Sequence, residues 1–197
     1  LADYVSELRK NDIHFNYLLN SSCLGNREFT RAWQKKFTAF MEKLIHIGIT
    51  RVTVSTPFLL EMIKSRFPHF HVKAGIYAQI DTPTRAIFWQ DLGADELTLE
   101  SFSINRDFPR LKAIRKAVTC NLQLIANHPC LANCSMQPYH QNGFAHSSAP
   151  GQNIFIDYCF LKCSRKRLEQ PANLIKAGWI RPEDIHYYEK IGYNNFK

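Results

Sequence analysis

The stretch RVTVSTPFLLEMIKSRFPHFHVKAGIY (residues 51–77) contains the structural unit that the rest of the chain repeats. Its two ends, RVTVS at 51–55 and FHVKAGIY at 70–77, are rich in β-branched and aromatic residues and predict strands. Residues 57–67 between them predict a helix with proline in its first turn. A strand, a helix and a second strand joined by short loops favour two parallel strands.

The same alternation extends in both directions along the chain. Further strands are predicted at residues 14–19, 96–99, 122–126 and 179–180 and from 195 onward, and further helices at residues 29–46, 82–92, 107–118, 165–175 and 182–191. About seven strands in one βα pattern predict a parallel sheet and favour a TIM-type (β/α)8 barrel over a doubly wound sheet. The absence of a G-x-G-x-x-G or Walker-type loop in the sequence also counts against a nucleotide-binding doubly wound fold.

The predicted barrel forms one α/β domain over residues 1–197 and has a cysteine-bearing insertion at about 128–164. Residues 128–156 show no clear hydrophobic periodicity, which is typical of a long functional loop. The chain begins at Leu1 and ends at Lys197 within a predicted strand, so we expect a fragment of a longer protein.

Composition and charge limit the classes of function. The net charge is +8, from 25 Lys and Arg against 17 Asp and Glu, and basic residues cluster at 162–167. Such a cluster suits RNA or an anionic metabolite, and the alternative is a solvated helix start beside negatively charged thiolates. No run of about 18 apolar residues occurs, so we expect no membrane segment.

Four cysteines carry the strongest functional signal. Cys130, Cys134, Cys159 and Cys163 follow the pattern C-x3-C-x24-C-x3-C. Residues four apart lie on one face of a helical turn, so each pair can direct two thiolates at one point and two pairs can form a four-sulfur site. An iron–sulfur cluster and a zinc ion both take tetrahedral sulfur ligands, so this reasoning leaves both open.

Disulfides are the third explanation for the cysteines. A chain of 197 residues with 45% hydrophobic composition buries enough surface to fold without them. Six cysteines without a signal-like N-terminus indicate a reducing compartment, and we therefore expect a cytoplasmic protein.

In a barrel, the active site forms at the C-terminal ends of the strands. Arg106, Arg181 and His140 are our candidate catalytic residues, because they can hold an anionic substrate near that end. Each has an alternative role: Arg181 begins a predicted helix where capping is common, and His140 lies in the aperiodic segment. Asp107, before Phe108 and Pro109, is predicted to be an N-cap rather than a catalytic carboxylate.

Several segments together resemble a known family. They are IKSRFP at 63–68, LGADELTLE at 92–100, SINRDFPRLKAIRKAV at 103–118, LQLIANHPCLANC at 122–134 and WIRPEDIHYYEKIGYNNFK at 179–197. The chain resembles the collagenase-like peptidase family U32 and its relatives that are not proteases. The resemblance implies an incomplete or complete TIM-type barrel, with the first unit before Leu1 and the end after Lys197 missing here.

The resemblance also implies a [4Fe-4S] cluster held by Cys130, Cys134, Cys159 and Cys163, although the two regular C-x3-C pairs depart from the family's commoner uneven spacing. It implies oxygen-independent hydroxylation or a related modification of a small anionic molecule or RNA. Two other functions stay open. A peptidase is one, although no Ser-His-Asp order or H-E-x-x-H motif supports it. The other is a binding or maturation module with a structural metal, whose partner subunit supplies the chemistry.

Overall fold

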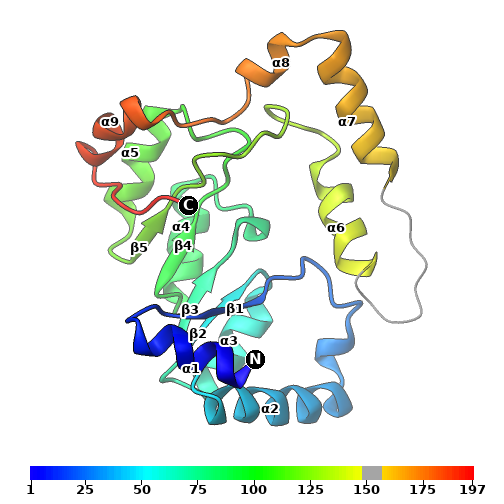
Figure 1. The fold of residues 1–197 in the computed structure, drawn as a ribbon, viewed down its shortest axis with the longest axis vertical. Coiled ribbons are helices and arrows are strands. Elements are labelled where there is room, and N and C mark those ends of the chain that lie inside the picture. Colours follow the sequence, from blue (N-terminus) through cyan, green and yellow to red (C-terminus); the bar gives the residue numbers. More distant parts are fainter. Residues whose placement is uncertain (148–156) are drawn as a thin grey trace.

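The computed structural model describes residues 1–147 and 157–197. Its centre is a five-stranded parallel sheet in which the strands follow one another in sequence order (Figure 1). The strands are β1 (Asn16–Leu19), β2 (Arg51–Val54), β3 (His71–Ala74), β4 (Glu96–Thr98) and β5 (Asn121–Gln123). The predicted α/β class and the parallel, sequential order are confirmed. The sheet is open in this part of the chain, with β1 and β5 at its edges.

Of the two strands predicted after β5, the one at residues 179–180 is absent, whereas the one from residue 195 onward is confirmed at its start by parallel pairing with Leu124. Residues 179–180 form no strand. Their backbone makes a single hydrogen bond to the segment after β5, from the Ile180 amide to the Ala126 carbonyl, at 2.9 Å. A two-residue apolar segment is too short to establish a ladder against a strand that has already ended. Near the end of the chain, Phe196 makes one parallel bridge with Leu124, where a further strand was expected to begin.

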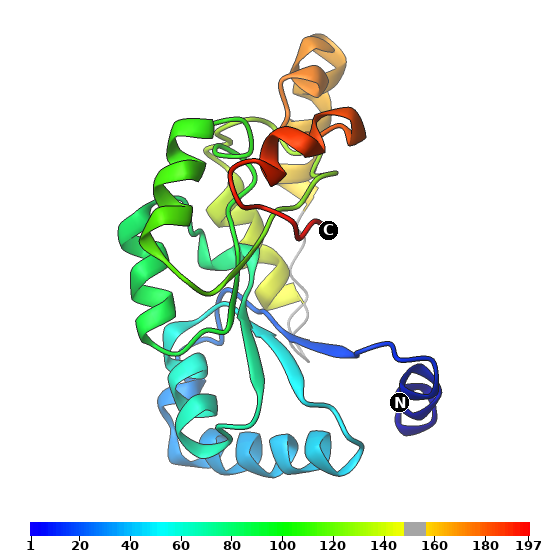
Figure 2. The same cartoon turned by 90° about the vertical axis from the view of Figure 1, so that its left-hand side faces the viewer.

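Helices alternate with the strands as the sequence predicts, and two further helices, at residues 2–10 and 137–147, are not predicted by it. They are α1 (Ala2–Lys10), α2 (Arg31–His46), α3 (Pro57–Arg66), α4 (Pro83–Asp91), α5 (Phe108–Ala117), α6 (Gln137–Ser147), α7 (Asp157–Glu169), α8 (Ala172–Ile175) and α9 (Ile185–Glu189), with 3-10 turns η1 (Arg27–Phe29), η2 (Ile76–Ala78) and η3 (Pro182–Asp184). Figure 2 shows α3, α4 and α5 along one face of the sheet, whereas α1 stands away from that layer. No helix in the described ranges is both long and apolar enough to cross a membrane.

Local side chains explain where three of these helices begin. The side chains of Thr30, Thr82 and Asp107 accept hydrogen bonds from the third backbone amide beyond each cap, at the starts of α2, α4 and α5. Proline occupies the first turn of α3, α4 and α5, where its missing N–H costs nothing. The prediction that Asp107 is an N-cap is confirmed.

The cysteine-bearing insertion is more ordered than its sequence pattern indicates. Residues 137–147 form helix α6, and the predicted helix at 165–175 is instead the end of α7 followed by the short α8. Residues 148–156, which belong to the predicted loop, lie outside the described part of the chain. Hydrophobic periodicity fails for α6 because its one buried residue is Gln141 rather than an apolar side chain.

The apolar core fills the space between the sheet and α2–α5. Alternate strand residues, such as Val52, Val72 and Leu97, are fully buried against helix residues such as Ile63 and Leu111. Because successive side chains of a strand point to opposite faces, the intervening residues lie on the other face of the sheet.

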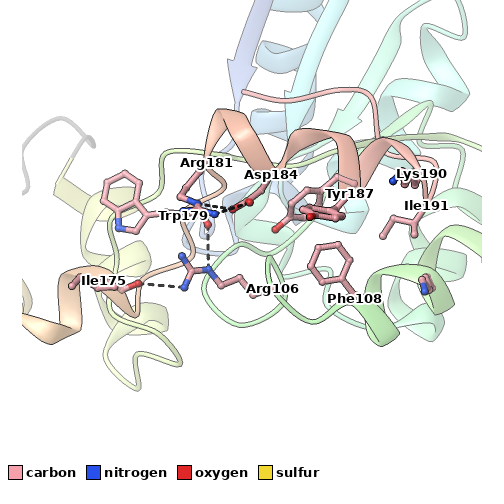
Figure 3. A pocket seen from close by; sticks show the side chains of 11 residues that line it. Arg106, Phe108, Ile175, Trp179, Arg181, Asp184, Tyr187, Lys190 and Ile191 are labelled. Atoms are coloured by element: carbon pink, nitrogen blue, oxygen red, sulfur yellow. Dashed lines mark hydrogen bonds and ion pairs between the residues drawn. The ribbon is translucent and has the colours of Figure 1, made fainter.

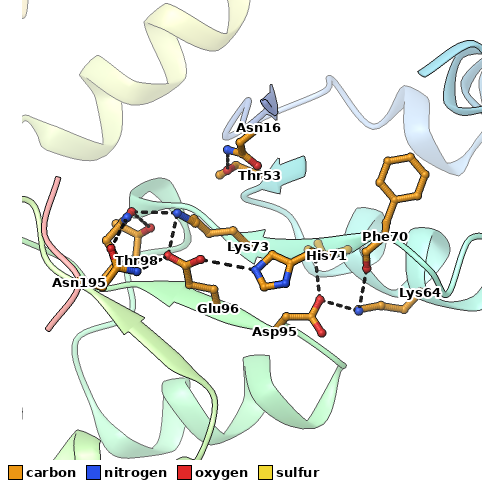
Figure 4. Close-up of polar contacts among 12 residues, drawn as sticks. Asn16, Thr53, Lys64, Phe70, His71, Lys73, Asp95, Glu96, Thr98 and Asn195 are labelled. Carbon is orange, nitrogen blue, oxygen red and sulfur yellow. Dashed lines mark hydrogen bonds and ion pairs between the residues drawn. The ribbon is translucent and has the colours of Figure 1, made fainter. Parts of the chain in front are cut away.

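That other face is polar, and hydrogen bonds and ion pairs connect its side chains on β3, β4 and β5 (Figure 4). Lys73 pairs with the nearly buried Glu96 at 2.7 Å and donates to Gln123 Oε1 at 3.2 Å. Asn195 donates to Glu96 at 2.8 Å and accepts from Gln123 at 3.0 Å, while His71 Nε2 lies 3.5 Å from Glu96. The network connects β3, β4 and β5 to the last residues of the chain.

Candidate functional site

The four cysteines of the two C-x3-C pairs line one cavity, of about 240 Å³. Cys130 and Cys134 lie in the turns that follow β5, and Cys159 and Cys163 lie one helical turn apart in α7. The first pair is therefore not helical, contrary to the expectation drawn from its spacing. Figure 1 shows α6 and α7 running beside each other at one side of the sheet, and the two helices are in contact.

All six cysteines are free, and the four in the cavity are half-buried. Within residues 1–147 and 157–197, no three His, Cys, Asp or Glu side chains are arranged as the ligands of a metal ion. The structure thus brings the four thiols to one cavity, and their joint ligation of a metal stays a prediction.

Electrostatics connect the thiols in this cavity. Burial is the largest cause that raises the pKa of Cys130 to about 11; nearby Cys163 and Cys134 contribute in the same direction, and the guanidinium of Arg167 acts against them. Arg167 also donates a hydrogen bond to the Pro129 carbonyl, which fixes the cation beside Cys130. Without a bound metal ion, the Cys130 side chain is therefore a neutral thiol at pH 7. A bound metal ion would favour the thiolate.

His128 links Cys130 to the end of β4. Its Nδ1 lies 2.5 Å from the hydroxyl of Ser101, and its Nε2 lies 3.3 Å from Cys130 Sγ. Burial lowers the pKa of His128, so the ring is neutral and one nitrogen donates while the other accepts. His128 lies just after a predicted strand, where the sequence places the active site, but it is not among the candidate catalytic residues Arg106, His140 and Arg181.

His140 lies in the cysteine cavity, as one of four side chains with an unpartnered buried nitrogen. Among the described residues that line the cavity, these atoms are Gln137 Nε2, His140 Nε2, Gln141 Nε2 and Arg167 Nε. Burial lowers the pKa of His140, so its imidazole is neutral. The cavity therefore combines thiols with polar nitrogen atoms from α6 and α7.

The other two candidate catalytic residues, Arg106 and Arg181, line a separate cavity of about 830 Å³ (Figure 3). Arg106 donates to the carbonyls of Trp179 and Ile175, both at 3.3 Å. Arg181 makes two bonds to Asp184, at 2.7 and 2.8 Å, and this pairing raises the pKa of Arg181 and lowers that of Asp184.

The structure therefore places the two arginines together and His140 elsewhere. Arg106 immediately precedes the cap of α5, and Arg181 is the N-cap of η3. His140 belongs to α6, which packs against α7. Sequence position alone does not distinguish these two groups, because all three residues follow strands or lie in the insertion.

Comparisons with known proteins agree with this architecture. No family model matches the sequence. The chain is 32% identical over 191 residues to a protein of Methanocaldococcus jannaschii named uncharacterized protease MJ1657. The alignment covers 97% of this chain and 57% of that protein, so the chain spans little more than half the length of this relative.

The fold resembles the solved structure of the U32 peptidase Mk0906, with a TM-score of 0.72 and 19% sequence identity. The superposition covers 99% of this chain and 73% of that one. The sequence relationship extends across nearly the whole chain, and the shared fold agrees with the U32 resemblance that its sequence segments indicate.

Proposed function

We propose that Cys130, Cys134, Cys159 and Cys163 hold a [4Fe-4S] cluster and that the protein acts in oxygen-independent hydroxylation or a related modification of a small molecule or RNA. One observation carries the proposal: thiols from two separate segments, the turns after β5 and helix α7, line the same cavity. Four thiolates are the usual ligand set of such a cluster.

The surroundings of the thiols favour a cluster over a zinc ion. A structural zinc site is closed around one ion, whereas this cavity has a volume of about 240 Å³. Unpartnered nitrogens of Gln137 and Arg167 also line it, and hydrogen bonds to sulfur tune cluster potentials. When bound, the cluster would transfer electrons or bind substrate directly.

The chain's own residues have distinct roles in this proposal. His128 orients Cys130 through the contact at 3.3 Å and is itself held by Ser101. Cys130 and Cys134 follow the C-terminal end of β5, and TIM barrels carry their active sites at the C-terminal ends of their strands. We infer that the sheet belongs to a TIM-type barrel and that the protein works in the reducing cytoplasm.

A small anionic substrate or RNA is the proposed partner of the arginine cavity. Lys112 and Lys190 join Arg106 and Arg181 in its lining, and Asp184, its acidic side chain, is already paired with Arg181. Guanidinium groups bind carboxylate and phosphate well. A partner subunit that supplies the chemistry remains the alternative if the cluster has only a structural role.

A peptidase is the second candidate, and the Ser101–His128–Cys130 contacts are the observation that favours it. The related archaeal protein is also named a protease. Two features oppose it: Ser101 is 1% exposed, and burial raises the pKa of Cys130, whereas a nucleophilic cysteine needs a lowered pKa. The cluster therefore remains our leading proposal.

Anaerobic purification followed by iron and sulfide analysis and absorption spectroscopy tests the cluster. We expect about four irons and four sulfides per chain. Cys134→Ser should lose most of both, whereas Cys120→Ser, which changes a half-buried thiol outside the cavity lining, should retain them. Bound zinc without sulfide, or equal loss in the two variants, would contradict the proposal.

A further inference from the structure

A larger cavity, of about 500 Å³, shares a wall with the cysteine cavity. Tyr77, Gln141 and Phe144 line both. The rest of its lining comes from β1 and the segment after it, from α2 and α3, and from α6: Leu18, Leu19, Asn20, Ser21, Ser22, Leu24, Trp33, Phe37, Leu59 and Ala145. The cavity therefore lies at the C-terminal end of β1, on the same edge of the sheet as the cysteines.

The lining of this cavity is uncharged. No Lys, Arg, Asp, Glu or His occurs among the described residues that line it. Trp33 and Phe37 form part of its apolar wall, stacked with ring centroids 4.9 Å apart and planes 8° from parallel. A charged ligand would lose its hydration here without gaining an opposite charge, so the cavity favours an uncharged molecule with an apolar, ring-shaped body.

Two polar groups of the lining have no partner of their own. Gln141 is 6% exposed, and its Nε2 has no hydrogen-bond partner in the described part of the chain. The amide of Gln79 donates to Gln141 Oε1 at 3.2 Å, so the Gln141 carbonyl is held and its NH2 group remains unused. The buried hydroxyl of Ser22 is also unpartnered among these residues. Leaving such groups unsatisfied costs free energy, which a ligand acceptor would recover.

We propose that this cavity binds an uncharged, ring-containing small molecule, or the matching part of a larger substrate, whose carbonyl or similar acceptor is held by Gln141 Nε2 and Ser22 Oγ. The cavity volume lies within the usual range for ligand pockets. A ligand in it would be separated from the cysteines only by the shared wall. The suggestion that such a ligand is acted on there rests on the proposed function, whereas the binding site itself does not.

The three tryptophans allow a direct test by fluorine NMR of protein labelled with 5-fluorotryptophan. Trp33 lines the uncharged cavity, Trp179 lines the arginine cavity, and Trp89 is buried in the core. The probes are benzamide and benzoate, which share a ring and differ in charge. We expect benzamide to shift the Trp33 resonance with saturation, to leave Trp89 and Trp179 in place, and to bind about tenfold more tightly than benzoate.

Matched variants of α6 identify the polar contact. Gln141→Leu should weaken benzamide binding about five- to tenfold, equivalent to one lost hydrogen bond. Asn142→Leu makes the same type of change at an exposed position next along the helix, and should bind benzamide like the original protein. Thermal melting of both variants checks that they are folded.

The outcomes separate this inference from the cluster proposal. A Trp33 shift that persists in metal-free Cys134→Ser supports the cavity whether or not the protein binds iron. If the protein contains the cluster but benzamide leaves Trp33 unmoved, or binds no better than benzoate, the inference is overturned. Equal weakening by Gln141→Leu and Asn142→Leu, with both folded, would overturn the role of Gln141.

Discussion

Tyr193 is a fully buried side chain whose polar end is satisfied by a distant backbone group. Its hydroxyl donates to the Leu111 carbonyl at 2.8 Å and so joins the segment after α9 to α5. Burial raises its pKa above the ordinary value of 10.0, because the ionised phenol would lose both its hydration and its hydrogen bond.

We predict that Tyr193→Phe lowers the free energy of unfolding by about 1 kcal/mol near neutral pH. Above the ordinary value of 10.0, the unfolded tyrosine ionises while the folded one stays neutral, so the original protein loses stability that the variant does not. The difference between the two proteins should therefore shrink as pH rises. Urea unfolding at about pH 8 and about pH 11 measures it.

Tyr139→Phe is the control for Tyr193→Phe, because Tyr139 is 75% exposed. It should change the free energy of unfolding by less than about 0.5 kcal/mol at either pH. If the difference in free energy of unfolding between Tyr193→Phe and the original protein stays constant from about pH 8 to about pH 11, burial does not raise the pKa of Tyr193.

The pH dependence of Cys130 alkylation distinguishes a buried cluster ligand from a peptidase nucleophile. Its pKa of about 11 predicts slow alkylation by iodoacetamide in the metal-free protein at neutral pH, with a rate that rises toward pH 11. Arg167→Leu should slow the reaction further, since Arg167 lowers this pKa. Mass spectrometry of the labelled peptide gives the rate.

Arg165→Leu is the matched control for that experiment. Arg165 belongs to the same helix, is exposed and pairs with Glu169, so its loss should leave Cys130 alkylation unchanged. Rapid alkylation of Cys130 at neutral pH would favour the peptidase and contradict the raised pKa.

At the scale of whole elements, α5 shows how a local signal determines a helix start. Asp107 accepts from the Arg110 amide at 3.0 Å, and its other oxygen lies 3.2 Å from the Arg110 side chain. Phe108 and Pro109 follow, which gives the helix a proline in its first turn. All of these contacts lie within four residues, so the sequence alone predicts them.

We predict that Asp107→Ala lowers the free energy of unfolding by about 1 kcal/mol through loss of the cap. Asp91→Ala, at the last residue of α4, removes an exposed carboxylate without a capping role and should have a smaller effect. Chemical denaturation of both proteins makes the comparison. Unchanged stability with lost activity in Asp107→Ala would instead identify a catalytic carboxylate.

Helix α6 shows the limit of local pattern. Residues 137, 140 and 141 face the cysteine cavity with two amides and an imidazole, while Tyr139 is exposed. Hydrophobic periodicity assumes that the buried face of a helix is apolar. Because α6 buries polar groups beside a cavity, its sequence resembles that of a loop, and only the packing of α6 against α7 distinguishes the two.

At the scale of the whole molecule, the polar network of Figure 4 joins residues far apart in sequence. Glu96 is 6% exposed and receives contacts from Lys73 and His71 on β3 and from Asn195 near the chain end. A buried carboxylate that loses its cation remains unpaired at a high cost in free energy. The network therefore makes the strand register sensitive to single substitutions.

We predict that Lys73→Met lowers the free energy of unfolding by about 3 kcal/mol, because it leaves Glu96 without its lysine. Adding Glu96→Leu to this variant should recover part of that loss, and a double-mutant cycle measured by urea unfolding gives the coupling energy. Lys10→Met, which breaks an exposed pair with Glu7, is the control and should cost less than about 1 kcal/mol. Additive effects of the Lys73 and Glu96 changes would contradict the network.

The sequence by itself determined the order of strands and helices from β1 to α5 and their parallel arrangement. Each of these depends on contacts within a few residues or on a repeating period, as in the caps Thr30, Thr82 and Asp107. It also identified Cys130, Cys134, Cys159 and Cys163 as one group, because their spacing repeats.

Only the tertiary structure decided which distant residues share a cavity. It placed His140 with the cysteines, placed Arg106 and Arg181 in another cavity, and added Gln141 to the site region. It also showed that residues 179–180 form no strand. The physical reason is that cavities form where separate elements pack, and the pairing of α6, α7 and the segment after β1 leaves no periodic signal in the chain.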